Sequence, residues 1–175
     1  MKYKFSEIAD IISGGTPKKK VPEYWGKSIP WITIKDFGNK YIDSCTNYLT
    51  EKGAENSSVN FTKDDDILIS ARGTVGELAM VHKGWTFNQS IYALRVNIQY
   101  ADPHYIYYWL NNNVDILKKS VHGSVFDTIT KKTFDLIEIE LPSLSKQKNI
   151  SSKLSQIDNK IQINKQINAN LLKLT

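Results

Sequence analysis

Short runs of apolar residues separated by turn-forming residues fill the first 140 positions, a pattern typical of many short strands. The clearest run, residues 67–69, follows three consecutive acids and predicts a turn leading into a buried strand. Further strands are predicted over residues 29–37 and 134–142, and as a pair within 77–96 joined around Lys83 and Gly84. Most of the chain is therefore expected to be a sheet-containing domain.

Helical spacing of apolar residues marks two further segments. Residues 5–12 predict a short helix with Phe5 and Ile8 on its apolar face. Residues 102–120 predict a longer one, because Asp102 can cap its first turn and Pro103 fits the first helical position.

The pattern changes after Pro142, where apolar residues follow a heptad-like repeat. A helix from Ser145 to Leu172 would have about 28 residues and a length of about 42 Å, without an internal glycine or proline. Such an amphipathic helix needs a partner surface. Its predicted contact seam is Ile150, Leu154, Ile157, Ile161, Asn164, Ile167, Asn168 and Leu171.

Charge changes this picture only at the C-terminal end. The chain of 175 residues carries a net charge of +5, but residues 1–140 hold 17 basic and 17 acidic residues. The whole excess lies in residues 141–175, so the main domain could bind DNA only through local basic clusters. Cys45 is the single cysteine, and neither a signal peptide nor an apolar membrane span is evident, so a cytoplasmic location is expected.

An arginine and two glycines follow the buried run, in the sequence "ILISARGTVG". Glycine permits a turn with positive φ or the close approach of another backbone. The turn could hold a phosphate, present Arg72 to a partner, or simply reverse the chain.

Two loops are rich in potential donors to DNA. "GGTPKKK" (14–20) lacks the spacing of a phosphate-binding loop, and is either a solvated turn or a basic loop whose lysines each neutralise a phosphate. "KKSVHGSVFDTITKK" (118–132) is either an ordinary connection or a second contact with nucleic acid.

Three features of the sequence invite a catalytic or metal-binding interpretation, but each fits a structural role better. "ADPHYIYYWL" resembles the catalytic motif of adenine methyltransferases only loosely, because His104 replaces a proline and the motif opens a helix. Glu138 and Glu140 alternate on a strand and fit a solvated face better than an acid–base pair. The three histidines share no ligand spacing with one another or with Cys45, so no metal site is predicted.

Several of these segments, taken in order, resemble a known family. They are "ISGGTPKKKVPEYWGKSIPWITIKD", "DDDILISARGTVGELAM", "NQSIYAL", "DPHYIYYWL" and "LIEIELPSLSKQKNISSKLSQIDNKI". Their order and spacing are similar to those of the DNA specificity subunits of type I restriction–modification systems. A complete subunit of that family has two target-recognition domains with long helices between and after them, so this chain resembles half a subunit.

The resemblance implies an α+β fold, with a curved, mainly antiparallel sheet and peripheral helices over residues 1–143. A long coiled-coil-type helix over 144–175 would serve as spacer and dimerisation element. Segments that vary among members, here 36–60 and 118–132, would read bases, whereas the shared Arg72 turn would brace the loop or hold a phosphate. The residues expected to contact DNA are Lys18, Lys19, Lys20, Lys35, Arg72, Thr74, Lys118, Lys119, His122, Ser124, Lys131 and Lys132.

The expected function is DNA recognition without catalysis. The resemblance implies that a partner modification subunit carries S-adenosylmethionine and methylates adenine, that a restriction subunit cuts DNA, and that two copies of this chain pair through their helices. The alternatives are a small catalytic domain, such as a solitary methyltransferase or nuclease, and a helical scaffold that does not bind DNA.

Overall fold

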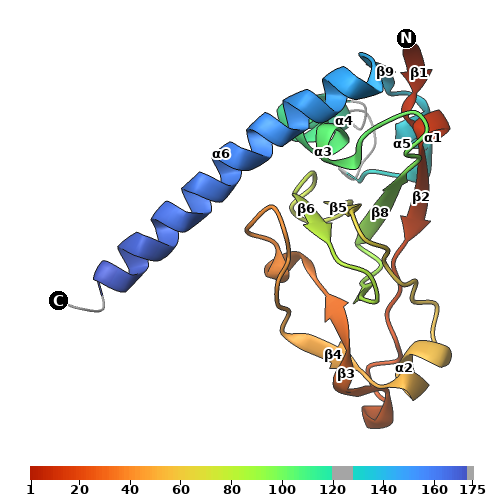
Figure 1. Cartoon of the computed structure of the whole chain (residues 1–175). Helices are drawn as coiled ribbons and strands as arrows, with labels where there is room; N and C mark the ends of the chain where they lie inside the picture. Colours follow the sequence, from red (N-terminus) through yellow and green to blue (C-terminus); the bar gives the residue numbers. More distant parts are fainter. Residues whose placement is uncertain (120–127, 173–175) are drawn as a thin grey trace.

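The computed structural model describes residues 1–119 and 128–172 (Figure 1). The strands are β1 (Lys2–Lys4), β2 (Ala9–Ser13), β3 (Trp25–Ile32), β4 (Asn47–Leu49), β5 (Asp66–Ser70), β6 (Leu78–Val81), β7 (Thr86–Phe87), β8 (Ile91–Val96) and β9 (Glu138–Glu140). The helices are α1 (Phe5–Ile8), α2 (Glu51–Glu55), α3 (Pro103–Asn112), α4 (Val114–Lys119), α5 (Lys131–Asp135) and α6 (Leu144–Leu171), with 3-10 turns η1 (Pro22–Tyr24) and η2 (Ile34–Asp36).

The centre of the molecule is an antiparallel sheet with strand order β2-β8-β5-β6. All five residues of β5 are buried. Ile67 and Ile69 belong to a cluster that includes residues of α1, α3 and α5, whereas Leu68 packs on the opposite face with Ile32 and Phe87. Because alternate residues of a strand point to opposite faces, a strand covered on both sides must be an unbroken apolar run.

Two smaller sheets flank this centre (Figure 1). Strands β4, β3 and β7 form one, in which β3 pairs antiparallel with β4 and parallel with β7. Strands β1 and β9 form the other, beside α1 and α5. The predicted α+β class with mainly antiparallel strands and a long final helix is confirmed, but the strands divide among three sheets. At the outer edge of the central sheet, Met80 of β6 forms an isolated bridge with Tyr41, while β3 pairs with β4 and β7 in a separate sheet.

The helix predicted over residues 5–12 is wrong in its second half. α1 ends at Ile8, and the following residues form β2, which pairs with β8. Ile11 and Ile12 consequently pack against the two opposite core clusters. The available edge of β8 therefore outweighs the helical spacing of the apolar residues.

The other segments are partly as predicted. Strand β3 ends at Ile32 and gives way to η2, and part of the strand predicted over 134–142 is helix α5, leaving only β9 extended. Ile137, Ile139 and Leu141 are buried, as expected. The predicted turn at residues 83–84 is present, but β6 and β8 both pair with β5, and β7 lies between them in the chain.

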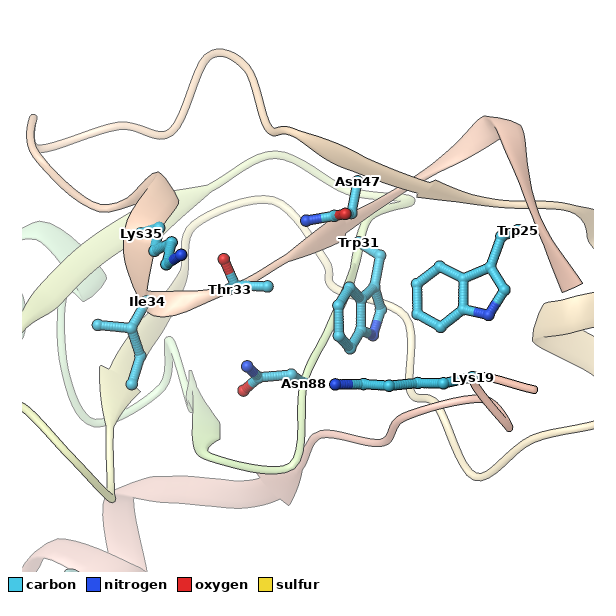
Figure 2. Close-up of a pocket in the computed structure, with 8 residues that line it drawn as sticks. All are labelled: Lys19, Trp25, Trp31, Thr33, Ile34, Lys35, Asn47 and Asn88. Carbon is cyan, nitrogen blue, oxygen red and sulfur yellow. The ribbon is translucent and has the colours of Figure 1, made fainter. Parts of the chain in front are cut away.

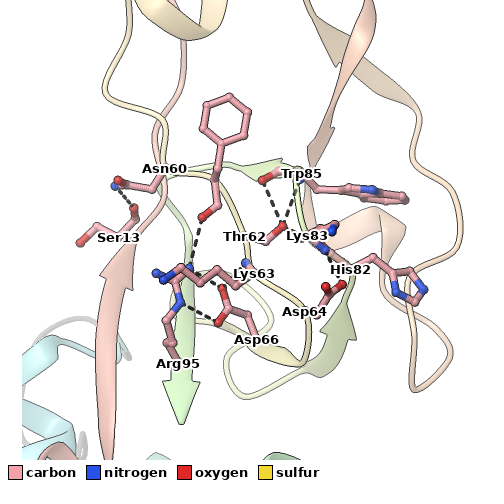
Figure 3. A network of polar contacts seen from close by, with 11 residues as sticks. Ser13, Asn60, Thr62, Lys63, Asp64, Asp66, His82, Lys83, Trp85 and Arg95 are labelled. Atoms are coloured by element: carbon pink, nitrogen blue, oxygen red, sulfur yellow. Dashed lines mark hydrogen bonds and ion pairs between the residues drawn. The ribbon is translucent and has the colours of Figure 1, made fainter. Parts of the chain in front are cut away.

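Polar contacts tie the acid-rich turn to the central sheet (Figure 3). Asp65 adopts a φ of 63°, which turns the chain into β5. Asp66 is 1% exposed and accepts hydrogen bonds from Nε and Nη2 of Arg95, at 3.0 and 2.7 Å. Lys63 donates its backbone N–H to the same carboxylate, at 2.8 Å. The predicted turn is present, but its third acid is also a buried partner of β8.

The long helix begins where the sequence predicts, within one residue, and Ser143 caps it. Gln147 is 1% exposed, accepts the backbone N–H of Asp102 at 2.9 Å, and donates to the carbonyl of Pro142 at 2.9 Å. Asp102 in turn caps α3 by accepting from the N–H of Tyr105. The first half of α6 thus packs on α3, while its second half extends away from the sheets (Figure 1). Within residues 1–119 and 128–172, no helix is both long enough and apolar enough to cross a membrane.

Candidate nucleic-acid interface

A groove of about 570 Å³ lies beside β3 (Figure 2). Its walls come from the loop after β2, from β3 and η2, from the start of β4, and from the turn before β8. The residues that line it are Lys19, Trp25, Trp31, Thr33, Ile34, Lys35, Asn47 and Asn88. Two of these are lysines and none is an acid, so the groove is positively charged although the domain as a whole is neutral.

Two tryptophans form the apolar wall of the groove. Trp25 and Trp31 meet edge to face, with ring centroids 5.1 Å apart. Nε1 of Trp31 donates to the carbonyl of Gly15 at 3.0 Å, which fixes the ring. Nε1 of Trp25 is buried and has no acceptor within the described parts of the chain.

The glycines of the loop 14–20 serve close packing. The N–H of Gly15 donates to the carbonyl of Phe87 at 2.9 Å, and a Cβ at Gly15 would overlap the backbone of Ser58. The loop is therefore anchored at its start. Lys18, Lys19 and Lys20 follow this anchor and are exposed, with Lys19 on the groove wall.

Asp36 does not line the groove, but it holds the segment that carries the lining residues Thr33 and Lys35. Its carboxylate accepts the backbone and hydroxyl groups of Thr33, at 2.8 and 2.9 Å, and those of Thr46, at 3.0 and 2.7 Å. Burial by itself would raise the pKa of Asp36, but these hydrogen bonds outweigh it and the pKa lies below its usual value. The carboxylate thus holds both ends of the segment that carries Lys35.

Cys45, in the same segment, stays uncharged at neutral pH. Burial raises the pKa of its thiol, which donates to the carbonyl of Asn47 at 3.2 Å. The thiol therefore adds no negative charge beside the groove, and its contact holds the backbone of Asn47.

The turn after β5 borders the same region. Gly73 and Gly76 have φ values of 77° and 90°, as the sequence motif led us to expect of a tight turn. Ser70 braces the turn, because its hydroxyl donates to the carbonyl of Thr74 and accepts the N–H of Glu77. Arg72 and Thr74 are exposed, and a Cβ at Gly73 would lie 4.0 Å from Ile34 of the groove wall. Ser70 therefore braces this loop, whereas the side chain of Arg72 is free of that role and exposed.

The remaining predicted DNA contacts lie elsewhere. Lys131 and Lys132 are exposed on α5, at the opposite end of the molecule from the groove (Figure 1). Lys118 and Lys119 end α4, and their side chains are not described. His122 and Ser124 lie outside the described residues. The structure therefore places Lys19 and Lys35 on one groove, with the turn that carries Arg72 and Thr74 next to Ile34 of its wall, and α5 lies apart from both.

The predicted helix seam divides into two parts. Ile150 and Leu154 are half-buried beside the domain, whereas Ile157, Ile161 and Ile167 are about half exposed. At about 100° per residue, the exposed seam is about a third of a turn around the helix from the side that packs on the domain. The rest of the seam, Asn164, Asn168 and Leu171, is also exposed.

The groove residues carry the two kinds of group that contact nucleic acids: positive charges for phosphates, and hydrogen-bonding side chains for base edges. Lysines can neutralise phosphates, and the carboxamides of Asn47 and Asn88 can pair with base edges, adenine above all. Sequence reasoning missed Trp25, Trp31, Thr33 and Asn88, and included Asn47 only within a variable segment. The spacing of the two tryptophans gave no usable signal, because the strand predicted over 29–37 leaves out Trp25 and the pairing register of β3 shifts between Trp25 and Ile29.

Comparison with known proteins identifies the family. The model of the type I restriction modification DNA specificity domain matches residues 1–173, so the chain belongs to this family. Among curated proteins, it is 32% identical over 179 residues to the type I restriction enzyme MjaIX specificity subunit of Methanocaldococcus jannaschii, covering 98% of this chain and 40% of that protein. It is also 32% identical over 160 residues to the EcoR124I/EcoR124II specificity subunit of Escherichia coli, covering 87% of this chain and 39% of that protein.

Solved structures share the fold. The HsdS subunit from Thermoanaerobacter tengcongensis superimposes with a TM-score of 0.72 at 22% identity, over 95% of this chain and 39% of that one. A chain from a study of complex assembly in the type I R-M system gives the same TM-score at 24% identity, over 98% of this chain and 41% of that one. This chain therefore spans about two fifths of the length of these relatives.

Proposed function

We propose that the chain recognises a specific DNA sequence for a type I restriction–modification complex, and that the groove beside β3 reads it. The observation that carries this proposal is the groove itself, in which Lys19 and Lys35 flank Asn47 and Asn88. In this proposal the lysines hold the DNA backbone, and the carboxamides discriminate bases. Arg72 extends the phosphate-binding rim from the adjoining turn.

In this proposal the chain performs no chemistry of its own. Glu138 and Glu140 are exposed on β9, and Asp102 caps α3, so the residues that invited a catalytic interpretation have structural or solvated positions. Methyl transfer would belong to a modification subunit that binds S-adenosylmethionine, and cleavage to a restriction subunit. Labelled S-adenosylmethionine bound by this chain alone would contradict this division of labour.

The test is a selection from random duplex DNA with the full chain. We expect one short sequence to be enriched, and Asn47→Ala or Asn88→Ala to relax the preference at one or two positions. A bidentate pair between a side chain and a base is worth about 1–3 kcal/mol, or about 5- to 150-fold between bases. Asn170→Ala, on the exposed end of α6, is the matched control. A pool without an enriched sequence, or two unaffected asparagine variants, would contradict the groove assignment.

We also propose that α6 pairs antiparallel with the α6 of a second copy. The exposed seam from Ile157 to Leu171 supports this, because an isologous interface needs a self-complementary surface. Asn164 and Asn168 would set the register of the pair. Two-fold symmetry then predicts identical half-sites in inverted orientation, with a gap set by a helix of about 42 Å, a little over one turn of duplex.

Sedimentation at micromolar concentration tests this pairing. Ile157→Glu combined with Leu171→Glu should convert dimers into folded monomers that bind the two-part site poorly. Ser152→Glu combined with Gln166→Glu adds the same charge away from the seam and should leave dimers intact. A monomeric wild-type chain, or a target with two unrelated halves, would rule out pairing between copies.

A further inference from the structure

A cleft between the loop 38–43, α3 and α6 holds a lysine that the DNA-binding proposal does not use. Lys40 lies in this loop, beside the edge of the central sheet. Its carbonyl accepts the N–H of Met80 at 2.6 Å, and the N–H of Ile42 donates to the carbonyl of Met80 at 3.1 Å. Ile42 is 2% exposed. The backbone of Lys40 is thus fixed to β6.

The side chain of Lys40 reaches from the sheet to both helices. Its ammonium group donates to the hydroxyl of Tyr108 on α3 and to the hydroxyl of Ser155 on α6, each at 2.9 Å. The ammonium also lies 4.4 Å from the centre of the Tyr108 ring. Tyr108 donates its own hydroxyl to Asp158 of α6 at 2.5 Å. One cation therefore connects three elements, and a carboxylate on the helix balances its charge.

Among the described residues, this cluster is the second of two places along α6 where side-chain hydrogen bonds attach the helix to the domain. The first is Gln147, at the start of the helix. Ser155 lies eight residues further on, about 12 Å along the axis. The attachment at Gln147 holds the start of α6. The attachment at Ser155 adds a second fixed point, which constrains the direction of the helix axis. From Ile163 to Leu171 the helix is exposed on every side.

We propose that Lys40 is a positioning residue that sets the angle at which α6 leaves the recognition domain. Gln147 and Leu171 are about 36 Å apart along the helix, so a tilt of about 10° at the first attachment moves the far end by about 6 Å. That is nearly two base pairs of about 3.4 Å each. Under the proposed function, on which this consequence rests, Lys40 therefore controls the gap between half-sites.

Distance measurements between spin labels test the angle without DNA. With Cys45→Ser as background, and with unlabelled chain in excess so that distances between two copies do not contribute, labels at Lys83→Cys and Gln166→Cys report the separation of the domain from the helix end. We expect one narrow distance distribution in the otherwise wild-type chain, a distribution at least twice as wide for Lys40→Met, and a narrow one for Lys40→Arg. Lys165→Met, at the rim of the same cleft, is the matched control and should also stay narrow.

A second variant and a DNA-binding measurement complete the test of Lys40. If Lys40→Met fails to fold, Ser155→Ala with Asp158→Asn removes the helix side of the cluster and should broaden the distribution. On DNA, Lys40→Met should lose the preference for one gap length while each half-site keeps its base preference. An unchanged distribution in both the Lys40 and the Ser155/Asp158 variants overturns the proposal. A wild-type chain that ignores gap length overturns only its consequence for DNA, because the distance result does not depend on it.

Discussion

Arg95 and Asp66 form a bidentate ion pair across neighbouring strands, with Nε and Nη2 of the arginine 3.0 and 2.7 Å from the two carboxylate oxygens. The carboxylate is 1% exposed, while the arginine side chain keeps 25% of its surface in solvent. The pair joins β8 to the first residue of β5, the strand that is buried on both faces (Figure 3). It therefore fixes the beginning of β5, whereas the Arg72 turn follows the other end of this strand, after Ser70.

Removal of the Asp66 charge should destabilise the domain. We expect Asp66→Asn to lower the free energy of unfolding by about 3 kcal/mol, because Arg95 loses the carboxylate that neutralises it in a largely buried site. Urea unfolding followed by circular dichroism measures the change. Glu138→Gln, an exposed carboxylate on β9, should change stability by less than about 0.5 kcal/mol. Equal effects of the two variants would contradict the role of the pair.

The lysines of the loop after β2 should contribute affinity but not specificity. Lys18→Ala, Lys19→Ala and Lys20→Ala combined should weaken binding to all sequences alike. For every phosphate that is no longer neutralised, the slope of log affinity against log salt should flatten by about 0.9. Lys63→Ala with Lys83→Ala, beside the acid-rich turn, is the control. An unchanged affinity and slope for the triple variant would remove this loop from the interface.

Arg72 should behave as a phosphate ligand. Arg72→Ala is expected to weaken DNA binding while leaving both the thermal midpoint and the preferred sequence unchanged, since the side chain is exposed and Ser70 braces the turn. Ser70→Ala should instead lower the thermal midpoint. A selection experiment in which Arg72→Ala prefers different bases would show that Arg72 reads sequence.

Acid should release the segment that Asp36 holds. The pKa of Asp36 is lowered in the fold, so its contribution to stability is complete above the unfolded value of about 4 and is lost as the pH falls through the lower, folded value. At pH 7 we expect Asp36→Asn to cost about 1 kcal/mol, because the amide nitrogen cannot accept hydrogen bonds. The difference from wild type should shrink below about pH 4. A difference that is independent of pH would mean that the charge of Asp36 is unimportant.

Local patterns were sufficient for several elements, and tertiary contacts overrode others. The cap at Asp102, the turn into β5 and the extent of α6 follow from residues within a few positions of each other, so the sequence predicted them well. The end of α1 at Ile8 did not follow, because a strand edge some 80 residues later in the chain competes for the next five residues. The division into three sheets was not predicted for the same reason, because it depends on pairing between strands that are far apart in the sequence.

The sequence by itself determined that this chain has a buried sheet, a tight turn at Gly73 and Gly76, and a long helix with an apolar seam. Each of these depends on the periodicity of side chains or on the backbone freedom of glycine, which are properties of short segments. Only the tertiary structure decided that Lys19, Lys35, Asn47 and Asn88 share one groove while Lys131 and Lys132 lie at the opposite end. Strand pairing brings these residues together across up to 69 positions of sequence, and long-range pairing of this kind has no local signature.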